Sequence, residues 1–144
     1  MMKRFRIVCF MIFMGWSALS YAQESNQSLP DGCELVGEIH LRTGNLKTDG
    51  RAMHSLDALV PKLITLGKGK VVRIEGYFAP SNSKDEKVKK SMNLAKEVEQ
   101  YLRTKYNKLG LDLYIAAQDD TVDKGKRQSV RILLYAKDFS EIKL

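Results

Sequence analysis

The strongest constraint on the fold is a strand pattern followed by a long helical pattern. Residues 71–77 are rich in β-branched side chains and flanked by glycine, which predicts a central strand. After a loop at residues 79–83, apolar residues recur every three or four positions over about five turns, which predicts an amphipathic helix. These positions are Val88, Met92, Ala95, Val98, Leu102 and Tyr106. Such a helix can carry the chain across a sheet to a further strand.

A strand is also predicted near the start of the domain. Residues 34–42 alternate between apolar and polar side chains, apart from an interruption at Val36 and Gly37. This pattern predicts a half-buried strand. Its buried side is expected to hold Leu35, Ile39 and Leu41.

A first helix is predicted to follow this strand. Either Thr48 or Asp49 can cap it, and its apolar positions begin at Ala52. Pro61 lies inside the pattern and removes one helical hydrogen bond. We therefore expect a kink there or a new short turn after Val60.

Two more strands are predicted, at residues 111–117 and 129–136, joined by polar residues 118–126. The order β-α-β-α-β-β predicts an α+β sandwich, with two helices on one face of a four-stranded mixed sheet and the last two strands antiparallel. The connection holds three aspartates at residues 119–123, but it lacks the glycine and terminal glutamate of a calcium loop. We expect a solvated hairpin loop there.

The chain begins with a pattern that is typical of a cleaved signal peptide. Three basic residues precede an apolar run at residues 7–19, and Ser20 and Ala22 supply the small residues for cleavage. The run is roughly 13 residues, short of the roughly 20 that span a bilayer. We predict a signal peptide at residues 1–22, a flexible lead-in at 23–33 and one domain at 34–144, with no membrane span after cleavage.

The charge balance argues against nucleic acid as a partner. The leader carries three of the 24 Lys and Arg residues and none of the 17 Asp and Glu residues, so its removal lowers the net charge from +7 to about +4. The remaining positive charges are interspersed with acids, as on an ordinary solvated surface. This mild excess is too small for a nucleic-acid-binding surface.

The sequence gives little support for catalysis or metal binding. Cys33 is the one cysteine outside the leader, so an intramolecular disulfide is excluded and an intermolecular one stays open. With His40 and His54 it could form a thiol catalyst, but no orienting acid is specified. Two histidines are also too few for structural zinc. We expect no catalytic residue, no metal and no cofactor.

Three segments resemble the OmpA-like C-terminal domain, by which many outer-membrane and flagellar-motor proteins hold peptidoglycan. Residues 44–60 resemble the turn and first helix of this family, and residues 72–77 resemble the strand that leads into its Gly-His-Thr-Asp segment. Five residues fit the spacing of its second-helix signature: Ser91, Ala95, Val98, Tyr101 and Leu102. The resemblance spans about residues 34–136 and implies the same fold in an exported protein.

The resemblance also implies that the family's ionic clamp is lost. In the family, an Asp after the second strand and an Arg on the next helix bind the diaminopimelate of the peptide stem. The matching positions here are Ala79 and Leu94, which cannot make the charge-assisted hydrogen bonds that a zwitterion needs. A one-turn shift of the helix would instead bring Lys96 to the groove.

What remains of the groove is expected to involve four residues: Tyr77, Ser81, Asn93 and Arg127. Tyr77 could stack on a sugar ring or could cover the edge of the core. Arg127 would stand in for one of the paired arginines that the family often has before its fourth strand, and Arg131 is an alternative.

The resemblance implies a non-enzymatic periplasmic envelope module with altered or weak peptidoglycan binding; association with the outer membrane stays open. The alternative is a protein-interaction or assembly subunit of the envelope, which uses the same scaffold without binding peptidoglycan. That alternative predicts an envelope protein as partner and an exposed apolar patch around Ala79 and Leu94.

Overall fold

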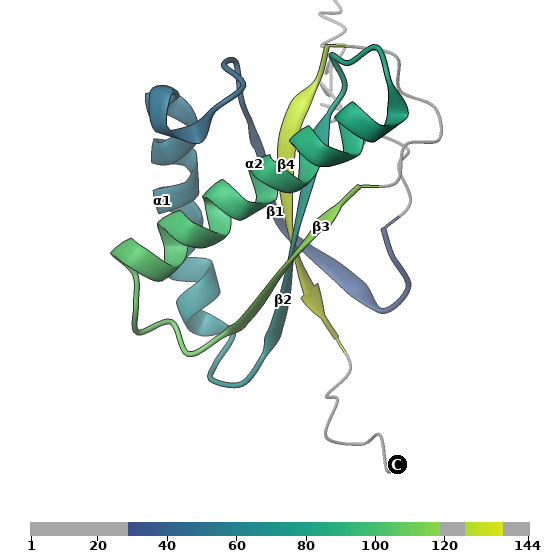
Figure 1. The fold of residues 1–144 in the computed structure, drawn as a ribbon. Coiled ribbons are helices and arrows are strands. Elements are labelled where there is room, and N and C mark those ends of the chain that lie inside the picture. The colour runs from purple at the N-terminus through teal and green to yellow at the C-terminus, as the bar shows by residue number, and fades with distance from the viewer. Residues whose placement is uncertain (1–28, 119–125, 137–144) are drawn as a thin grey trace, which may run out of the picture.

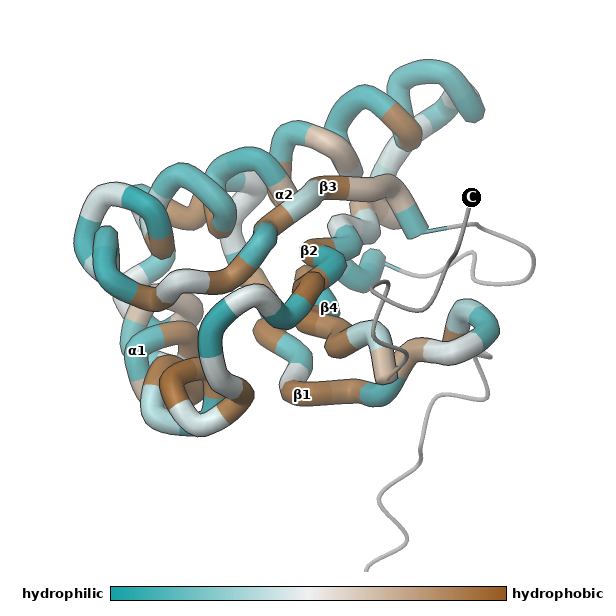
Figure 2. Tube along the Cα trace, turned by 90° about the horizontal axis from the view of Figure 1, so that it is seen from below, coloured by the Kyte–Doolittle hydropathy of each residue, from teal (hydrophilic) through white to brown (hydrophobic). Residues whose placement is uncertain are grey.

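The computed structural model describes residues 29–118 and 126–136. The predicted signal peptide, most of the lead-in and the aspartates of the 119–123 stretch lie outside the described residues. The described residues form an α+β fold in which two helices lie on one face of a four-stranded mixed sheet (Figures 1 and 2), as the sequence predicts. The elements are β1 (Cys33–His40), the 3-10 helix η1 (Leu46–Thr48), α1 (Gly50–Thr65), β2 (Val71–Phe78), α2 (Lys84–Lys105), β3 (Asp112–Ala117) and β4 (Gln128–Tyr135).

We expected the last two strands to form a hairpin, but the strand order of the sheet separates them. The sheet runs β1-β4-β2-β3, with β2 and β3 parallel and β4 antiparallel to both β1 and β2. The last two strands are therefore antiparallel in direction but are not neighbours. The physical reason is burial: Val130, Ile132 and Leu133 of β4 are each 0% exposed, which suits a central strand better than an edge strand.

The interruption predicted in the first strand is an irregularity in β1. The pairing of β1 with β4 shifts register between Leu35 and Gly37. An extra residue in a strand moves the side chains before it to the other face. Ile39 and Leu41 are buried as predicted, whereas the prediction for Leu35 is wrong, because this side chain is 49% exposed.

Asp49 joins the end of β1 to α1. It is the N-cap of α1, and its carboxylate accepts hydrogen bonds from the amides of Arg42 (2.7 Å) and Ala52 (3.0 Å). The cap prediction is confirmed for Asp49. The helix continues through Pro61 to Thr65, so no new turn begins after Val60.

We expect Asp49→Ala to lower the free energy of unfolding by about 1 to 3 kcal/mol, because the buried amide of Ala52 and the partly buried amide of Arg42 would lose their acceptor. The hydrogen bond from the Arg42 amide, with that from Ala52, lowers the pKa of Asp49. The carboxylate of Asp49 therefore binds a proton more readily in the unfolded chain than in the folded protein. Its contribution to stability is present above the unfolded pKa of about 4 and is lost as the pH falls through the lower pKa of the folded protein. Urea titrations at several pH values would measure it. If the free energy of unfolding changed with pH equally in Asp49→Ala and in the unmodified protein, this role of Asp49 would be contradicted.

Hydrogen bonds to Asp57 of α1 fix the C-terminal end of α2 against α1. Asp57 Oδ1 accepts hydrogen bonds from the hydroxyls of Tyr101 and Tyr106, both at 2.7 Å, and Oδ2 accepts one from Lys105 Nζ at 3.0 Å. These contacts join residues more than 40 positions apart along the chain. They connect α1 to the C-terminal end of α2.

The sheet face away from the helices carries charged side chains that pair across the strands. Register places Glu38 opposite Arg131 and Arg131 opposite Glu75. Arg131 donates a hydrogen bond to Glu75, and Arg73 Nε lies 2.9 Å from Glu75 Oε2. Glu75 and Arg131 are 1% and 4% exposed. Both members of this pair are thus withdrawn from water.

Candidate functional site

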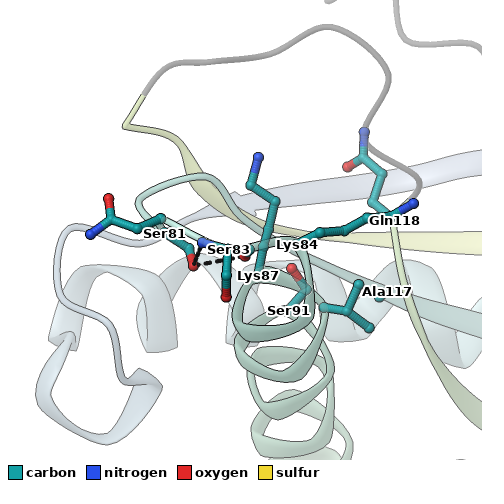
Figure 3. A pocket seen from close by; sticks show the side chains of 9 residues that line it. Ser81, Ser83, Lys84, Lys87, Ser91, Ala117 and Gln118 are labelled. Carbon is teal, nitrogen blue, oxygen red and sulfur yellow. Dashed lines mark hydrogen bonds between the residues drawn. The ribbon is translucent and has the colours of Figure 1, made fainter.

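A groove of about 620 Å³ lies where β2 and β3 end and α2 begins (Figure 3). Its described lining consists of Ser81, Asn82, Ser83, Lys84, Lys87, Val88, Ser91, Ala117 and Gln118. In open sheets with parallel strands, ligands commonly bind outside the carboxyl ends of those strands. β2 and β3 are the one parallel pair among the described strands. The groove therefore occupies a favourable position for binding.

Local hydrogen bonds shape the loop at one side of the groove. Ser83 is the N-cap of α2, and its hydroxyl accepts a hydrogen bond from the amide of Glu86 at 3.1 Å. The Ser81 hydroxyl donates to the Ser83 carbonyl at 3.1 Å, a bond drawn in Figure 3. These bonds fix the start of the helix and leave hydroxyl and amide groups around the cavity.

The close packing of α2 on β2 sets the depth of the groove. Gly76 of β2 lies so near the helix that a Cβ atom there would be 1.9 Å from the carbonyl oxygen of Ser91. The Ser91 hydroxyl accepts a hydrogen bond from the amide of Phe78 at 2.9 Å. Ser91 therefore lines the groove and also attaches α2 to β2.

The described lining of the groove carries positive charge. Lys84 and Lys87 line it, and none of the described lining residues is acidic. The acids of the first turn, Asp85 and Glu86, are not among the lining residues, and Glu86 forms an ion pair with Lys90 at 2.8 Å. The hydrogen bond and charge of Lys90 lower the pKa of Glu86. The amino end of α2 adds further positive potential. This lining suits hydroxyl and carboxylate groups.

The structure brings only one of the four predicted groove residues to the cavity. Ser81 lines it, whereas Tyr77, Asn93 and Arg127 do not. Tyr77 is 0% exposed, and the Arg127 guanidinium lies 4.4 Å from the centre of its ring. Arg127 Nη1 also bonds Glu38 Oε1 at 3.2 Å. Tyr77 thus covers the sheet instead of offering a stacking surface, and Asn93 is an exposed helix residue.

The positions matched to the family's clamp also lie away from the cavity. Leu94 is 2% exposed and belongs to the core, and Ala79 is 6% exposed. The exposed apolar patch predicted around them is therefore absent from the described residues, and that prediction is wrong. Lys96 is exposed but is not among the lining residues. The helix presents its first two turns to the groove, so Lys84 and Lys87 face it instead.

Sequence reasoning missed these two lysines as site residues. Residues 84–90 combine lysines with the acids Asp85 and Glu86, a charge pattern typical of a helix surface, and these two acids lie in the first turn of α2. A usable signal was present: Lys84 and Lys87 are one turn apart and directly follow the loop after a central strand. Gln118 was likewise assigned to a loop, although it follows β3 at the same edge of the sheet.

Neither a protein-family profile nor a curated protein sequence matches this chain. No helix among the described residues has the length and apolar character needed to cross a membrane. Residues 29–118 and 126–136 contain no group of three or more His, Cys, Asp or Glu side chains that could hold a metal ion.

Proposed function

We propose that this protein is a non-enzymatic module of the bacterial periplasm that binds peptidoglycan weakly, through the groove at the amino end of α2. The observation that carries the proposal is the polar, positively charged lining of this groove at the carboxyl ends of β2 and β3. The predicted signal peptide supports export. The resemblance of residues 34–136 to the OmpA-like domain supports the choice of ligand.

The lining also supports an altered mode of binding. A zwitterionic ligand needs a carboxylate for its ammonium group and a cation for its carboxylate. Lys84 and Lys87 supply cations, and the described lining supplies no carboxylate. Hydroxyl and amide groups of Ser81, Asn82 and Gln118 can hydrogen-bond sugar hydroxyls or peptide groups. The described lining would thus hold the ligand by its anionic and neutral parts.

Co-sedimentation with purified peptidoglycan sacculi tests this proposal directly. The protein obtained by expressing the full 144-residue chain should sediment with sacculi. Lys84→Glu should raise the apparent Kd about threefold to tenfold, which corresponds to roughly 0.7 to 1.4 kcal/mol. The reason is that an anionic ligand would meet a carboxylate in place of an ammonium group.

Lys89→Glu is the matched control, because it makes the same charge change on the same helix at an exposed residue outside the groove lining. It should leave binding close to that of the unmodified protein. No sedimentation of the unmodified protein would reject the proposal. Equal losses in the two variants would show attraction by overall charge alone and would reject the groove as the site.

A further inference from the structure

The two outer strands of the sheet differ in how they are protected from further pairing. β1 contains the irregularity at Leu35 and Gly37 and carries Glu34 and Glu38. Bulges and charges are common means of blocking an edge strand. β3 has the sequence DLYIAA, without proline, glycine or lysine, and no described strand pairs with its outer edge. Of the two outer strands among the described residues, β3 is therefore the less protected, with Asp112 at its start as its one charged residue.

The hydrogen bonds of β3 identify the groups that point outward. The amides of Asp112 and Gln118 donate to the carbonyls of Lys70 and Gly76 of the β2 side, at 2.9 and 2.7 Å. Since hydrogen-bonding direction alternates along a strand, Leu113, Ile115 and Ala117 direct their backbone groups away from β2. A partner strand would bond to these three residues.

One outward carbonyl on this edge already accepts a hydrogen bond from a side chain of the same chain. Arg103 of α2 donates from Nη2 to the carbonyl of Leu113 at 3.1 Å, and its Nε pairs with Glu99 at 3.1 Å. A carbonyl oxygen has two lone pairs and can accept a second hydrogen bond. Arg103 therefore leaves antiparallel pairing at Leu113 possible.

We propose that β3 pairs with β3 of a second copy of this chain, in an antiparallel, two-fold symmetric arrangement centred on Ile115. In this register Leu113 faces Ala117 of the second copy, and Tyr114 faces Ala116 of the second copy. A large side chain thus meets a small one at each step away from the centre, on both faces of the strand. The same surface serves both copies, as a two-fold dimer requires. The two sheets join into one.

The short strand limits the strength of the association. β3 has six residues, so the interface is at the small end of specific interfaces, and we expect a Kd of about 10 µM to 1 mM. In sedimentation equilibrium of the protein from the full chain, the average mass should rise toward twice the monomer value as the protein concentration is raised through this range of Kd values. A constant monomer mass up to about 1 mM would overturn the proposal.

Ala116→Lys should abolish the rise in mass, because it places an ammonium group on the edge against Tyr114 of the second copy. Leu35→Lys is the matched control, since it adds the same residue at an exposed site on β1, the opposite edge. It should leave dimerisation unchanged. Loss of dimerisation in Leu35→Lys with retention in Ala116→Lys would place the interface elsewhere and would reject the β3 assignment.

Amide hydrogen exchange of the unmodified protein gives a test that needs no variant. Raising the concentration should slow the exchange of Ile115 and Ala117, whose amides point outward. It should change that of Tyr114 and Ala116 little, since their amides point toward β2. Equal changes in the two sets, or none in either when the protein is dimeric, would contradict pairing through this edge.

Discussion

Glu75→Ala is expected to lower the free energy of unfolding by about 3 to 5 kcal/mol, the usual effect of removing one partner of a buried ion pair. The side chains of Glu75 and Arg131 are 2% and 5% exposed, and Glu75 also accepts a bond from Arg73. Without the carboxylate, the guanidinium of Arg131 would stay buried with no anionic partner on β2. Urea unfolding followed by circular dichroism measures the loss.

The double variant Glu75→Leu with Arg131→Met is the control for this expectation. It removes both charges and fills the volume with apolar side chains, a change that is often neutral or stabilising for buried pairs. Its stability should therefore lie well above that of Glu75→Ala. A loss of under about 1 kcal/mol in Glu75→Ala would show that water reaches Arg131 freely, which would contradict the burial argument.

Gly76→Ala is expected to cost about 3 kcal/mol or more, at the upper end of the range for overpacking. The added Cβ would lie 1.9 Å from the carbonyl oxygen and 2.9 Å from the carbonyl carbon of Ser91, and backbone atoms cannot rotate away. α2 would have to move off β2, which would also lengthen the hydrogen bond from the Phe78 amide to the Ser91 hydroxyl, now 2.9 Å. The same urea titration measures this cost.

Gly50→Ala provides the comparison. Gly50 is the first residue of α1, and a Cβ there would meet nothing within 4 Å. The substitution should be neutral or stabilise the protein by up to about 1 kcal/mol, because alanine favours helix and restricts the unfolded chain. Similar effects of the two substitutions would contradict the close approach of α2 to β2. Since Ser91 lines the groove, Gly76→Ala should also weaken the peptidoglycan binding that we propose for this groove.

The local features of the fold were predictable because nearby residues decide them. The carboxylate of Asp49 caps α1 through the amide of Ala52, three positions later, so this role could be anticipated from the sequence. The break in alternation at Val36 and Gly37 likewise marked the irregularity in β1. Its consequence for Leu35 was missed, since the face of a side chain depends on pairing with β4, almost 100 positions later.

The candidate site was predicted only in part, for a similar reason. Ser81 lies three residues after the end of β2, and the family resemblance placed it at the groove that it lines. The sequence could not show which side of α2 faces the sheet, because the rotation of a helix about its axis is fixed only by its contacts with the sheet. Here the contact of Ser91 with Gly76 sets the rotation, so that Lys87 faces the groove and Leu94 enters the core.

The sequence by itself determined the chain order of the strands and the two α-helices, and it narrowed the cap of the first helix to Thr48 or Asp49, because periodicity and capping depend on residues that are close along the chain. The tertiary structure decided the strand order, the burial of Glu75 with Arg131 and the residues that line the groove. These depend on contacts across long separations, 56 positions in the case of that ion pair. No local pattern encodes which of several compatible partners a strand or helix face will meet.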